Sequence, residues 1–555
     1  MAKQRPRLEP TSNPPAAGMG VSVWRPLNRP FFRALWIASL TSSIGTWMHE
    51  AGAGWLMTSL TSSPIMIALM QTATTLPIFF LALPAGALAD GVDRRRMLIV
   101  TQSLMFITAA TLGVAALVDA MTPWLLLVLT FALGAAAALN APAWQATTPE
   151  LVPRSDLPSA VALTGMGLNL ARAIGPALGG VVVAALGPWA VFLVNAVSFL
   201  CVIAVLYGWR RKQFPSRIPA EPVFSATRAA IRYARHAPAL RAVLIRTALF
   251  VPFASALWAL LPFLARHEMG LDAVGYGILF GCLGAGAVTG AGILPKMQQR
   301  FSRDSLAVSA TILFAAATIA MAEIRQIGWL YLVMAGAGAG WITLMVSLNT
   351  ATQTAVPTWV RARALALYLL TFQGGMAAGS TLWGAVAAHA GVSSALLCAA
   401  GALILGLAAI RRYPLNGVEE LDLTPSAHWP EPTVTAKLDP QDGPVLVTVE
   451  YRVDPERAPE FTSAMHAVRQ QRLRDGALRS GLYSDPTDPG RYVETFVVES
   501  WAEHLRQHER VTVSDRVTEE RARAFHIGDA PPAMSHFVSA RRADLSAEKP
   551  VESRE

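Results

Sequence analysis

Cysteine and charge are both scarce in this chain. Only three of its 555 residues are cysteine, all in apolar segments and none in a C-x-x-C pair, so neither a disulfide framework nor a metal site is indicated. Charged residues make up 15% of the chain and hydrophobic residues 53%, a balance that a soluble domain of this size would find hard to keep in solution. We therefore expect a membrane protein.

Two short signals are also missing. No nucleotide-binding loop of the form G-x-x-x-x-G-K-[ST] occurs. We therefore expect any energy-requiring step to be driven by an ion or solute gradient and not by ATP hydrolysis in this chain. Residues 1–31 contain five basic residues and several prolines, but no apolar core followed by a small-residue cleavage site. We interpret this segment as a disordered cytoplasmic tail without a signal peptide.

The apolar residues are gathered into about twelve runs, each long enough to cross a hydrocarbon core of about 30 Å as a helix. Six runs precede a basic, proline-containing segment at 210–240, and six follow it. We interpret 210–240 as a cytoplasmic linker whose second half, 225–236, forms an amphipathic helix on the inner leaflet. The runs are 33–58, 64–89, 97–118, 123–146, 157–185, 188–209, 241–267, 273–296, 304–323, 328–353, 360–388 and 392–410.

One stretch between the second and third runs combines an acid with a run of cations. It is residues 86–96, GALADGVDRRR, which begins at Gly86 and carries Asp90, Arg94, Arg95 and Arg96. Three arginines in so short a loop place it in the cytoplasm by the positive-inside rule, and the basic residues of the other loops put both chain ends on that side. The plain alternative is that these arginines are topology anchors that contact lipid phosphates. The net charge of +9 comes mainly from such loops and tails, so no nucleic-acid partner is expected.

The G-x-x-x-D spacing followed by arginines resembles the signature loop of the major facilitator superfamily. Gly91 and Asp93 depart from the usual pattern, which has a base and a glycine there. The resemblance implies an all-α membrane protein of twelve helices in two parallel six-helix halves, 32–209 and 241–412. A repeat of about two hundred residues agrees with two halves: it aligns Val152-Pro153 with Val356-Pro357, Gly175 with Gly379, and Gly180 with Gly384.

A small-residue motif lies in the fifth run. Gly175, Pro176, Gly179 and Gly180 place small side chains at helical spacing, which lets another helix approach closely, and a proline that bends the helix. The motif resembles the Gly-Pro-x-x-Gly-Gly motif of exporters in this superfamily. Plain helix packing explains it almost as well.

Glu50 and Arg172 are the charges expected deepest in the membrane, where each costs about 2.5–3.5 kcal/mol at a helix centre unless it faces protein or water. If both face a central cavity, Glu50 is the candidate for a proton site or a cation contact, His49 beside it can titrate near neutrality, and Arg172 holds an anion or pairs with an acid. Alternatively, Glu50 sits near the outer interface and Arg172 bonds to backbone carbonyls. Arg246 is expected to snorkel to the headgroups, outside the substrate site. Weaker cavity candidates are the amides of Gln71, Asn169 and Gln373, together with Asn140, Gln145, Asn195 and Asn349.

The signature loop also suggests a gate. Asp90 is placed to accept hydrogen bonds from the start of the eleventh run, where Arg361 and Arg363 add to the positive helix N-terminus. By resemblance to the superfamily, this contact latches the inner side while the protein faces outward. In alternating access, this contact between Asp90 and the start of the eleventh run forms and breaks while the cavity stays in place.

Beyond the last run the composition changes. We interpret 413–443 as a linker, 444–541 as a compact cytoplasmic domain and 542–555 as a disordered tail. Strand patterns at 445–453, 477–484, 491–500 and 534–541, with helices at 455–475 and 501–525, give the order βαββαβ, which is ferredoxin-like and similar to antibiotic-biosynthesis monooxygenases. His504 and His508 are one helical turn apart, but we interpret their surroundings, Glu503, Arg506, Glu509 and Arg510, as a charged surface and not a metal site.

The whole pattern resembles one branch of the superfamily. The motifs at 45–47, 55–56, 62–64, 93–96, 149–153 and 171–176 are similar to enterobactin exporters, and with 501–510 the chain is identified as resembling the transmembrane secretion effectors. The resemblance implies proton-coupled efflux of a small drug- or siderophore-like compound from the bacterial inner membrane, with no cofactor. Partners are then the substrate, protons and the lipid bilayer. Two alternatives are a fused monooxygenase-like enzyme that modifies the exported compound, and a sensor that no longer transports; the C-terminal domain is otherwise a regulatory or dimerising module.

Overall fold

The computed structural model describes residues 24–153, 155–209, 223–408, 412–415, 422–426, 428–429 and 438–539. Residues 1–23 and 542–555 of the predicted tails, residues 210–222 of the first linker and about half of the 413–443 linker lie outside these residues. Residues 24–31, which were also predicted to be a disordered tail, include a 3-10 turn at Arg25–Asn28 and the start of α1. Nine of the described helices are long and apolar enough to cross a membrane, and α1, α12 and α13 complete the twelve-helix fold. The first six spans are α1 (Pro30–Leu60), α2 (Pro64–Gly91), α3 (Arg94–Leu117), α4 (Pro123–Leu151), α5 (Leu157–Leu186) and α6 (Pro188–Tyr207).

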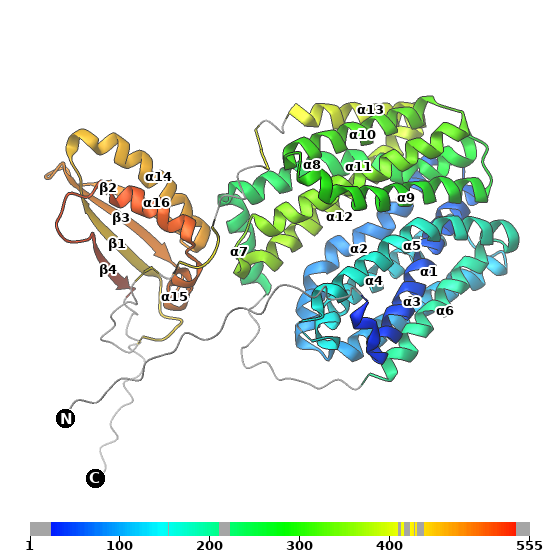
Figure 1. Cartoon of the computed structure of the whole chain (residues 1–555), viewed down its shortest axis with the longest axis horizontal. Coiled ribbons are helices and arrows are strands. Elements are labelled where there is room, and N and C mark those ends of the chain that lie inside the picture. Colours follow the sequence, from blue (N-terminus) through cyan, green and yellow to red (C-terminus); the bar gives the residue numbers. More distant parts are fainter. Residues whose placement is uncertain are drawn as a thin grey trace, which may run out of the picture.

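The second six follow a short helix, α7 (Val223–His236), which confirms a helix in the linker. They lie beside the first six as a separate group in Figure 1, and each begins and ends within a few residues of its predicted run. The predicted domain limits stay our interpretation. The spans are α8 (Pro238–Phe263), continued by a π-helical turn at Leu264–Glu268, then α9 (Ala273–Gln298), α10 (Arg303–Glu323), α11 (Ile327–Thr354), α12 (Thr358–Ala390) and α13 (Val392–Gly406).

Proline and glycine set many of the helix ends. Five spans open on a proline, whose missing N–H falls where a helix has no acceptor for it. Gly187 ends α5 and Gly391 ends α12, with φ angles of 99° and 86° that favour glycine. The opening prolines are Pro30, Pro64, Pro123, Pro188 and Pro238.

Glycines place α5 and α12 in equivalent positions in the two halves. A Cβ added to Gly175 would lie 2.5 Å from the Cβ of Trp47 in α1, and one on Gly379 would lie 2.1 Å from the Pro252 carbonyl oxygen in α8. Each helix therefore packs tightly on the first helix of its own half. The same two helices also reach the opposite half, α5 against α9 and α12 against α2. The repeat seen in the sequence is thus a repeat of helix contacts.

The closest α5–α9 and α12–α2 contacts across the halves involve little side-chain bulk, whereas α1 and α9 meet through aromatic rings, with Trp55 stacked on Tyr276 at 5.7 Å between ring centres. A Cβ on Gly180 of α5 would lie 2.4 Å from the Ala273 carbonyl oxygen of α9, and one on Gly384 of α12 would lie 2.6 Å from the Ala68 Cβ of α2. The Thr72 hydroxyl donates to the Ala377 carbonyl oxygen at 3.1 Å. These contacts lie toward the end of the bundle where α2 and α9 begin.

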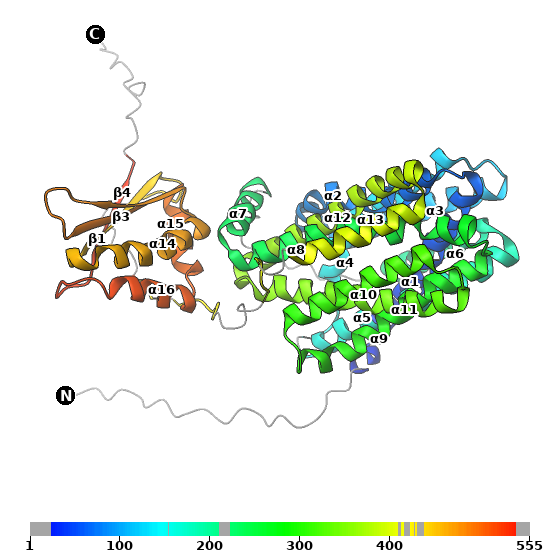
Figure 2. The same ribbon diagram turned by 90° about the horizontal axis from the view of Figure 1, so that it is seen from above.

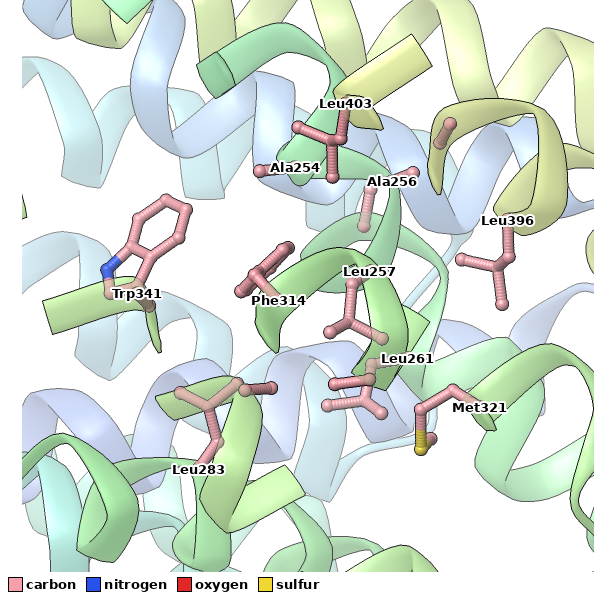
Figure 3. Close-up of a cluster of buried hydrophobic side chains, with 14 of the residues drawn as sticks. Ala254, Ala256, Leu257, Leu261, Leu283, Phe314, Met321, Trp341, Leu396 and Leu403 are labelled. Atoms are coloured by element: carbon pink, nitrogen blue, oxygen red, sulfur yellow. The ribbon is translucent and has the colours of Figure 1, made fainter. Parts of the chain in front are cut away.

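The second half has a continuous hydrophobic core. Aromatic and aliphatic side chains of α8, α9, α10, α11 and α13 converge there around the fully buried Phe314, as Figure 3 shows. The rings of Phe314 and Trp341 lie 5.8 Å apart. This packing makes the second half one body.

The snorkelling predicted for Arg246 is wrong. Its side chain is only 5% exposed, its Nη2 donates to Asp304, and its Nε donates to the Tyr413 carbonyl oxygen at 2.7 Å. Asp304 lies in the first turn of α10, close enough to pair with α8, so the cation is satisfied inside the protein without reaching the headgroups. Its exclusion from the substrate site stays a prediction.

The C-terminal domain is a four-stranded antiparallel sheet with helices on one face (Figure 2). The strand order is β2-β3-β1-β4, and the element order is the predicted βαββαβ, with the second helix in two pieces. The elements are β1 (Val445–Arg452), a 3-10 turn (Pro455–Arg457), α14 (Ala458–Asp475), β2 (Arg479–Ser484), β3 (Arg491–Val498), α15 (Trp501–Arg510), α16 (Val513–Arg523) and β4 (Ala533–Val538).

The single helix predicted at 501–525 is wrong because Thr512 starts a new one. Its hydroxyl accepts from the Asp515 backbone N–H while the Asp515 carboxylate accepts from the Thr512 N–H. This capping box fixes the start of α16 after α15 has ended at Arg510.

The charged surface predicted around His504 and His508 is wrong for His504, Glu503 and Arg510, whereas Arg506 and Glu509 are exposed as predicted. His504 is fully buried, and its ring centre lies 4.9 Å from that of His508 and 4.8 Å from that of His536 in β4. Arg510 is 6% exposed and its Nη1 donates to Glu503 at 2.6 Å. We call His504, His508 and His536 the histidine cluster. Burial lowers the pKa of His504 to about 3 and that of His508 to about 4, and neighbouring cationic groups add to the effect.

We expect Gly180→Val to open the contact between α5 and α9. The added side chain meets the Ala273 carbonyl group, and overpacking of this kind costs about 1–3 kcal/mol because backbone must move. Thermal unfolding of the detergent-solubilised protein should shift down by several degrees. Gly165→Ala is the matched control in α5, since a Cβ there meets nothing within 4 Å, and equal melting temperatures for the two variants would contradict the packing.

The histidine cluster should make the C-terminal domain sensitive to mild acid. Because the folded pKa values lie below the ordinary value of about 6.5, the unfolded chain binds more protons, so the free energy of unfolding falls as the pH drops from about 6.5 toward 4. Hydrogen exchange of the α15 and β4 amides in the full chain measures this. His508→Phe should reduce the slope, while the exposed His466→Gln should not. An exchange-derived stability that is flat between pH 7 and 4.5 would contradict it.

Candidate substrate cavity

A cavity of about 400 Å³ lies between the two halves. The first half lines it with residues of all six of its helices, α1 to α6, and the second half with residues of α8, α9, α11 and α12. It is thus built from both bodies that would move relative to one another, and it is large enough for a small organic molecule.

The polar groups of the cavity come mostly from the first half. Glu50 of α1 and Arg172 of α5 both line it and interact electrostatically, as a carboxylate and a guanidinium. The Arg172 guanidinium carbon lies 5.1 Å from the ring centre of Trp47, and its Nε has no hydrogen-bond partner in the described part of the chain. One donor of Arg172 therefore remains for a ligand or water.

His49 lines the cavity but is 2% exposed. Its ring packs against Phe192 with centres 4.7 Å apart, and neither ring nitrogen bonds to any described residue. The role predicted for His49 in proton transfer therefore stays a prediction.

The predicted amides divide into two groups. Gln71 of α2 and Gln373 of α12 line the cavity, whereas Asn169 is not among the lining residues. The Asn140 Oδ1 accepts from the Thr101 hydroxyl at 2.9 Å, which makes it a tie between α4 and α3. The Asn195 Oδ1 in α6 accepts from the Thr46 hydroxyl of α1 at 3.5 Å. These last two amides join helices of the first half.

The aromatic wall of the cavity was missed by sequence reasoning. The Trp258 ring lies 5.1 Å from Trp341 and 5.8 Å from Phe280, and Trp341 lies 5.9 Å from Phe372. The Trp258 indole nitrogen is buried and has no partner among the described residues. Aromatic residues inside apolar runs resemble ordinary core residues, so no pattern in one sequence marks them. The wall offers stacking surfaces and one free donor from the second half to the cavity that Glu50 and Arg172 line from the first half.

The arginines of the signature loop are bonded to protein. Arg94 pairs with Glu150 at the end of α4 at 2.7 Å, and Arg95 donates to the carbonyl oxygens of Leu206 and Tyr207 at the end of α6 at 2.9 and 2.8 Å. They tie α3 to α4 and α6 within the first half, so they are more than lipid anchors. The side chain of Asp90 lies outside the described parts, so its latch with Arg361 and Arg363 stays a prediction.

Comparisons with known proteins agree with this geometry. The chain matches the family model described as transmembrane secretion effector over residues 21–544. It is 29% identical to the enterobactin exporter EntS of Salmonella typhi over 385 residues, covering 68% of this chain and 91% of the relative. The staphyloferrin A transporter of Staphylococcus aureus is 24% identical over 50% of this chain and 70% of its own, and the multidrug efflux pump Tap of Mycolicibacterium fortuitum is 25% identical over 70% and 96%.

Solved structures show the same fold. A peptide-binding POT family transporter superposes with a TM-score of 0.57 at 13% identity, covering 69% of this chain and 95% of its own. A bacterial homologue of the human lysosomal transporter Spinster, in an inward-facing conformation, gives 0.55 at 13% identity over 69% and 98%. With the family model matching nearly the whole length, the chain belongs to the transmembrane secretion effector family and is a multi-pass membrane transporter of the major facilitator superfamily.

Proposed function

We propose that this protein exports a small drug- or siderophore-like compound across the inner membrane by alternating access, with protons entering in exchange. The observation that carries this proposal is the cavity itself, in which Glu50 and Arg172 lie together between two bodies joined by small-residue contacts. The relatives that export enterobactin and drugs support the class of substrate.

The coupling step follows from the shared position of the two charges. An ionised Glu50 offers a carboxylate to a cationic or hydrogen-bond-donating group of the substrate, whereas a protonated Glu50 is neutral and loses that attraction. Proton and substrate therefore compete for Glu50, so proton uptake from outside releases the substrate, and loss of the proton to the cytoplasm restores the site. Arg172 donates to other polar groups of the substrate. The aromatic wall holds the apolar part of the substrate by stacking.

The direction of access follows from where the halves touch. The named cross-half contacts lie from the middle of the bundle toward the end where α2 and α9 begin, and by the predicted topology that is the outer side. In our proposal the state described here therefore faces the cytoplasm, with both chain ends on that side. Closing the inner side then engages Asp90 with the start of α12.

A fused enzyme is the second candidate function. A pocket of about 120 Å³ lies between α14 and strands β2 and β3, lined by His466, Arg469 and the buried Glu494, among others. Glu494 accepts from Arg472 Nε at 2.8 Å, so the pocket ends on a paired carboxylate. Such a site suits binding of a small polar molecule and favours a role for the domain beyond linking.

We expect Glu50→Gln to abolish proton-driven transport. The amide keeps the size of the side chain but can neither take up nor release a proton, so an imposed pH gradient no longer drives accumulation. Inverted membrane vesicles given labelled enterobactin or ethidium, with and without the gradient, measure this. Glu323→Gln, an exposed carboxyl at the end of α10, is the matched control and should transport normally. Gradient-driven uptake at the wild-type rate in Glu50→Gln would remove Glu50 from the mechanism.

Asp90→Asn should slow transport without uncoupling it. Losing the negative charge weakens attraction to the α12 N-terminus and to Arg361 and Arg363, so the outward-facing state becomes less populated. In the same vesicle assay the maximal rate should fall several-fold while the dependence on the pH gradient remains. Asp119→Asn, an exposed acid in the loop after α3, should behave as wild type. A normal rate in Asp90→Asn would exclude the latch.

A further inference from the structure

The C-terminal domain is docked on the membrane part through helix α7. Arg232 of α7 donates to Glu503 of α15 at 3.2 Å, with side chains only 17% and 12% exposed. His236 at the end of α7 is hydrogen-bonded to Gln470 of α14 at 3.0 Å. Figure 2 shows α7 between the domain and the remaining helices. Two polar contacts thus join α7 to two different helices of the domain.

Two arginines of the domain reach aromatic rings of the membrane part. The Arg510 guanidinium carbon lies 4.5 Å from the ring centre of Trp359, in the first turn of α12, and that of Arg474 lies 5.6 Å from the ring of Tyr233 in α7. Tyr233 and Trp359 also meet edge to face, 5.7 Å apart. Cation–π contacts of this kind are strongest where they are shielded from water.

These arginines are held in place by acids of their own domain. Arg510 bonds to Glu503 at 2.6 Å, and Arg474 bonds to Asp475 at 2.7 Å and to Asp515 at 2.6 Å. Burial by itself would raise the pKa of Glu503, but the Arg510 hydrogen bond and the charges of Arg510 and Arg232 keep that pKa below its ordinary value. The docking surface is therefore preorganised and does not need to form when the parts meet.

Helix α7 touches both halves of the transporter. It packs against α8 and α12 of the second half and against α2 of the first half. Tyr233 is buried in a cluster with Leu240, Val356 and Val360, where α7, α8 and α12 meet. The contact with α2 is at the end opposite the cross-half glycine contacts. The sequence predicts that α7 lies on the inner leaflet, whereas the structure packs it against α2, α8 and α12.

We propose that the docked C-terminal domain is a conformational brake on the transporter. While the domain holds α7 and the first turn of α12, the halves keep the arrangement described here, and release of the domain lets α2 and α12 approach each other at the α7 end. The reason is geometric, because rocking moves α2 against α12 and α7 contacts both. The proposal rests on alternating access but not on any particular substrate or coupling ion.

Distances between two spin labels test the brake without a substrate. Labels are placed at Val92→Cys, the residue that follows α2, and Thr358→Cys, the first residue of α12, both exposed, in a full-length chain whose Cys201, Cys282 and Cys398 are replaced by serine. We expect one long distance to dominate in the otherwise native chain. Arg232→Gln should raise the ratio of short to long distances about tenfold, the effect of losing about 1.4 kcal/mol of docking energy.

Three matched variants control the measurement. His236→Ala breaks the second contact from the α7 side and should act in the same direction, which guards against misfolding caused by Arg232→Gln. Arg516→Gln breaks an exposed ion pair with Glu520 on the same domain and should leave the distances unchanged. In a third variant, His236→Cys is cross-linked to Gln470→Cys with a bifunctional thiol reagent, and residues 92 and 358 carry small labels that do not react with thiols. This cross-link should remove the short distances.

The outcomes are distinct. Unchanged distance distributions in both Arg232→Gln and His236→Ala would overturn the brake, whatever the protein transports. A shift in both variants would support the brake even if vesicles show no proton-driven export, and in that case only the proposed function would fail.

Discussion

The structure depends on the cost of placing a charge inside a membrane, which is about 2.5–3.5 kcal/mol at a helix centre unless the charge finds a partner or water. The protein meets this cost in two ways. Arg246 is paired directly with Asp304 and donates to the Tyr413 carbonyl oxygen, so it joins α8 to α10. Arg172 instead faces the cavity with its Nε free for a ligand or water and with Glu50 near it. The two cations therefore differ in their surroundings: one contacts an acid directly within the protein, and the other lines a cavity.

Small residues supply the second condition for transport. Large side chains at the contacts between the halves would interdigitate and resist sliding, whereas Gly180 against Ala273 and Gly384 against Ala68 bring backbones together with little to interlock. Within each half the aromatic and aliphatic packing around residues such as Phe314 resists change. Rigid bodies joined by smooth contacts are what a rocking motion requires.

Much of the fold was predictable because membrane spans are set by length and apolarity alone. The runs at 64–89 and 273–296 matched α2 and α9 within a few residues, and the deepest charges, Glu50 and Arg172, do line the cavity. What failed depended on tertiary partners. Nothing in the sequence around Arg246 points to Asp304, 58 residues away. Trp258 and Trp341 looked like core residues because a lining aromatic and a buried one have the same local pattern.

The wrong prediction of a solvated surface around His504 also arose from tertiary partners that the sequence does not reveal. Those partners show how the C-terminal domain is attached to the transporter. A helix rich in Glu, Arg and His suggests a solvated surface, yet one side of α15 is buried against the sheet and its Glu503 and Arg510 are paired and turned toward α7 and α12. Charges that are shielded from water need partners, and Glu503 and Arg510 find some of theirs in the transporter, at Arg232 and Trp359. The charges that suggested a solvated surface therefore help to attach the domain to α7 and α12.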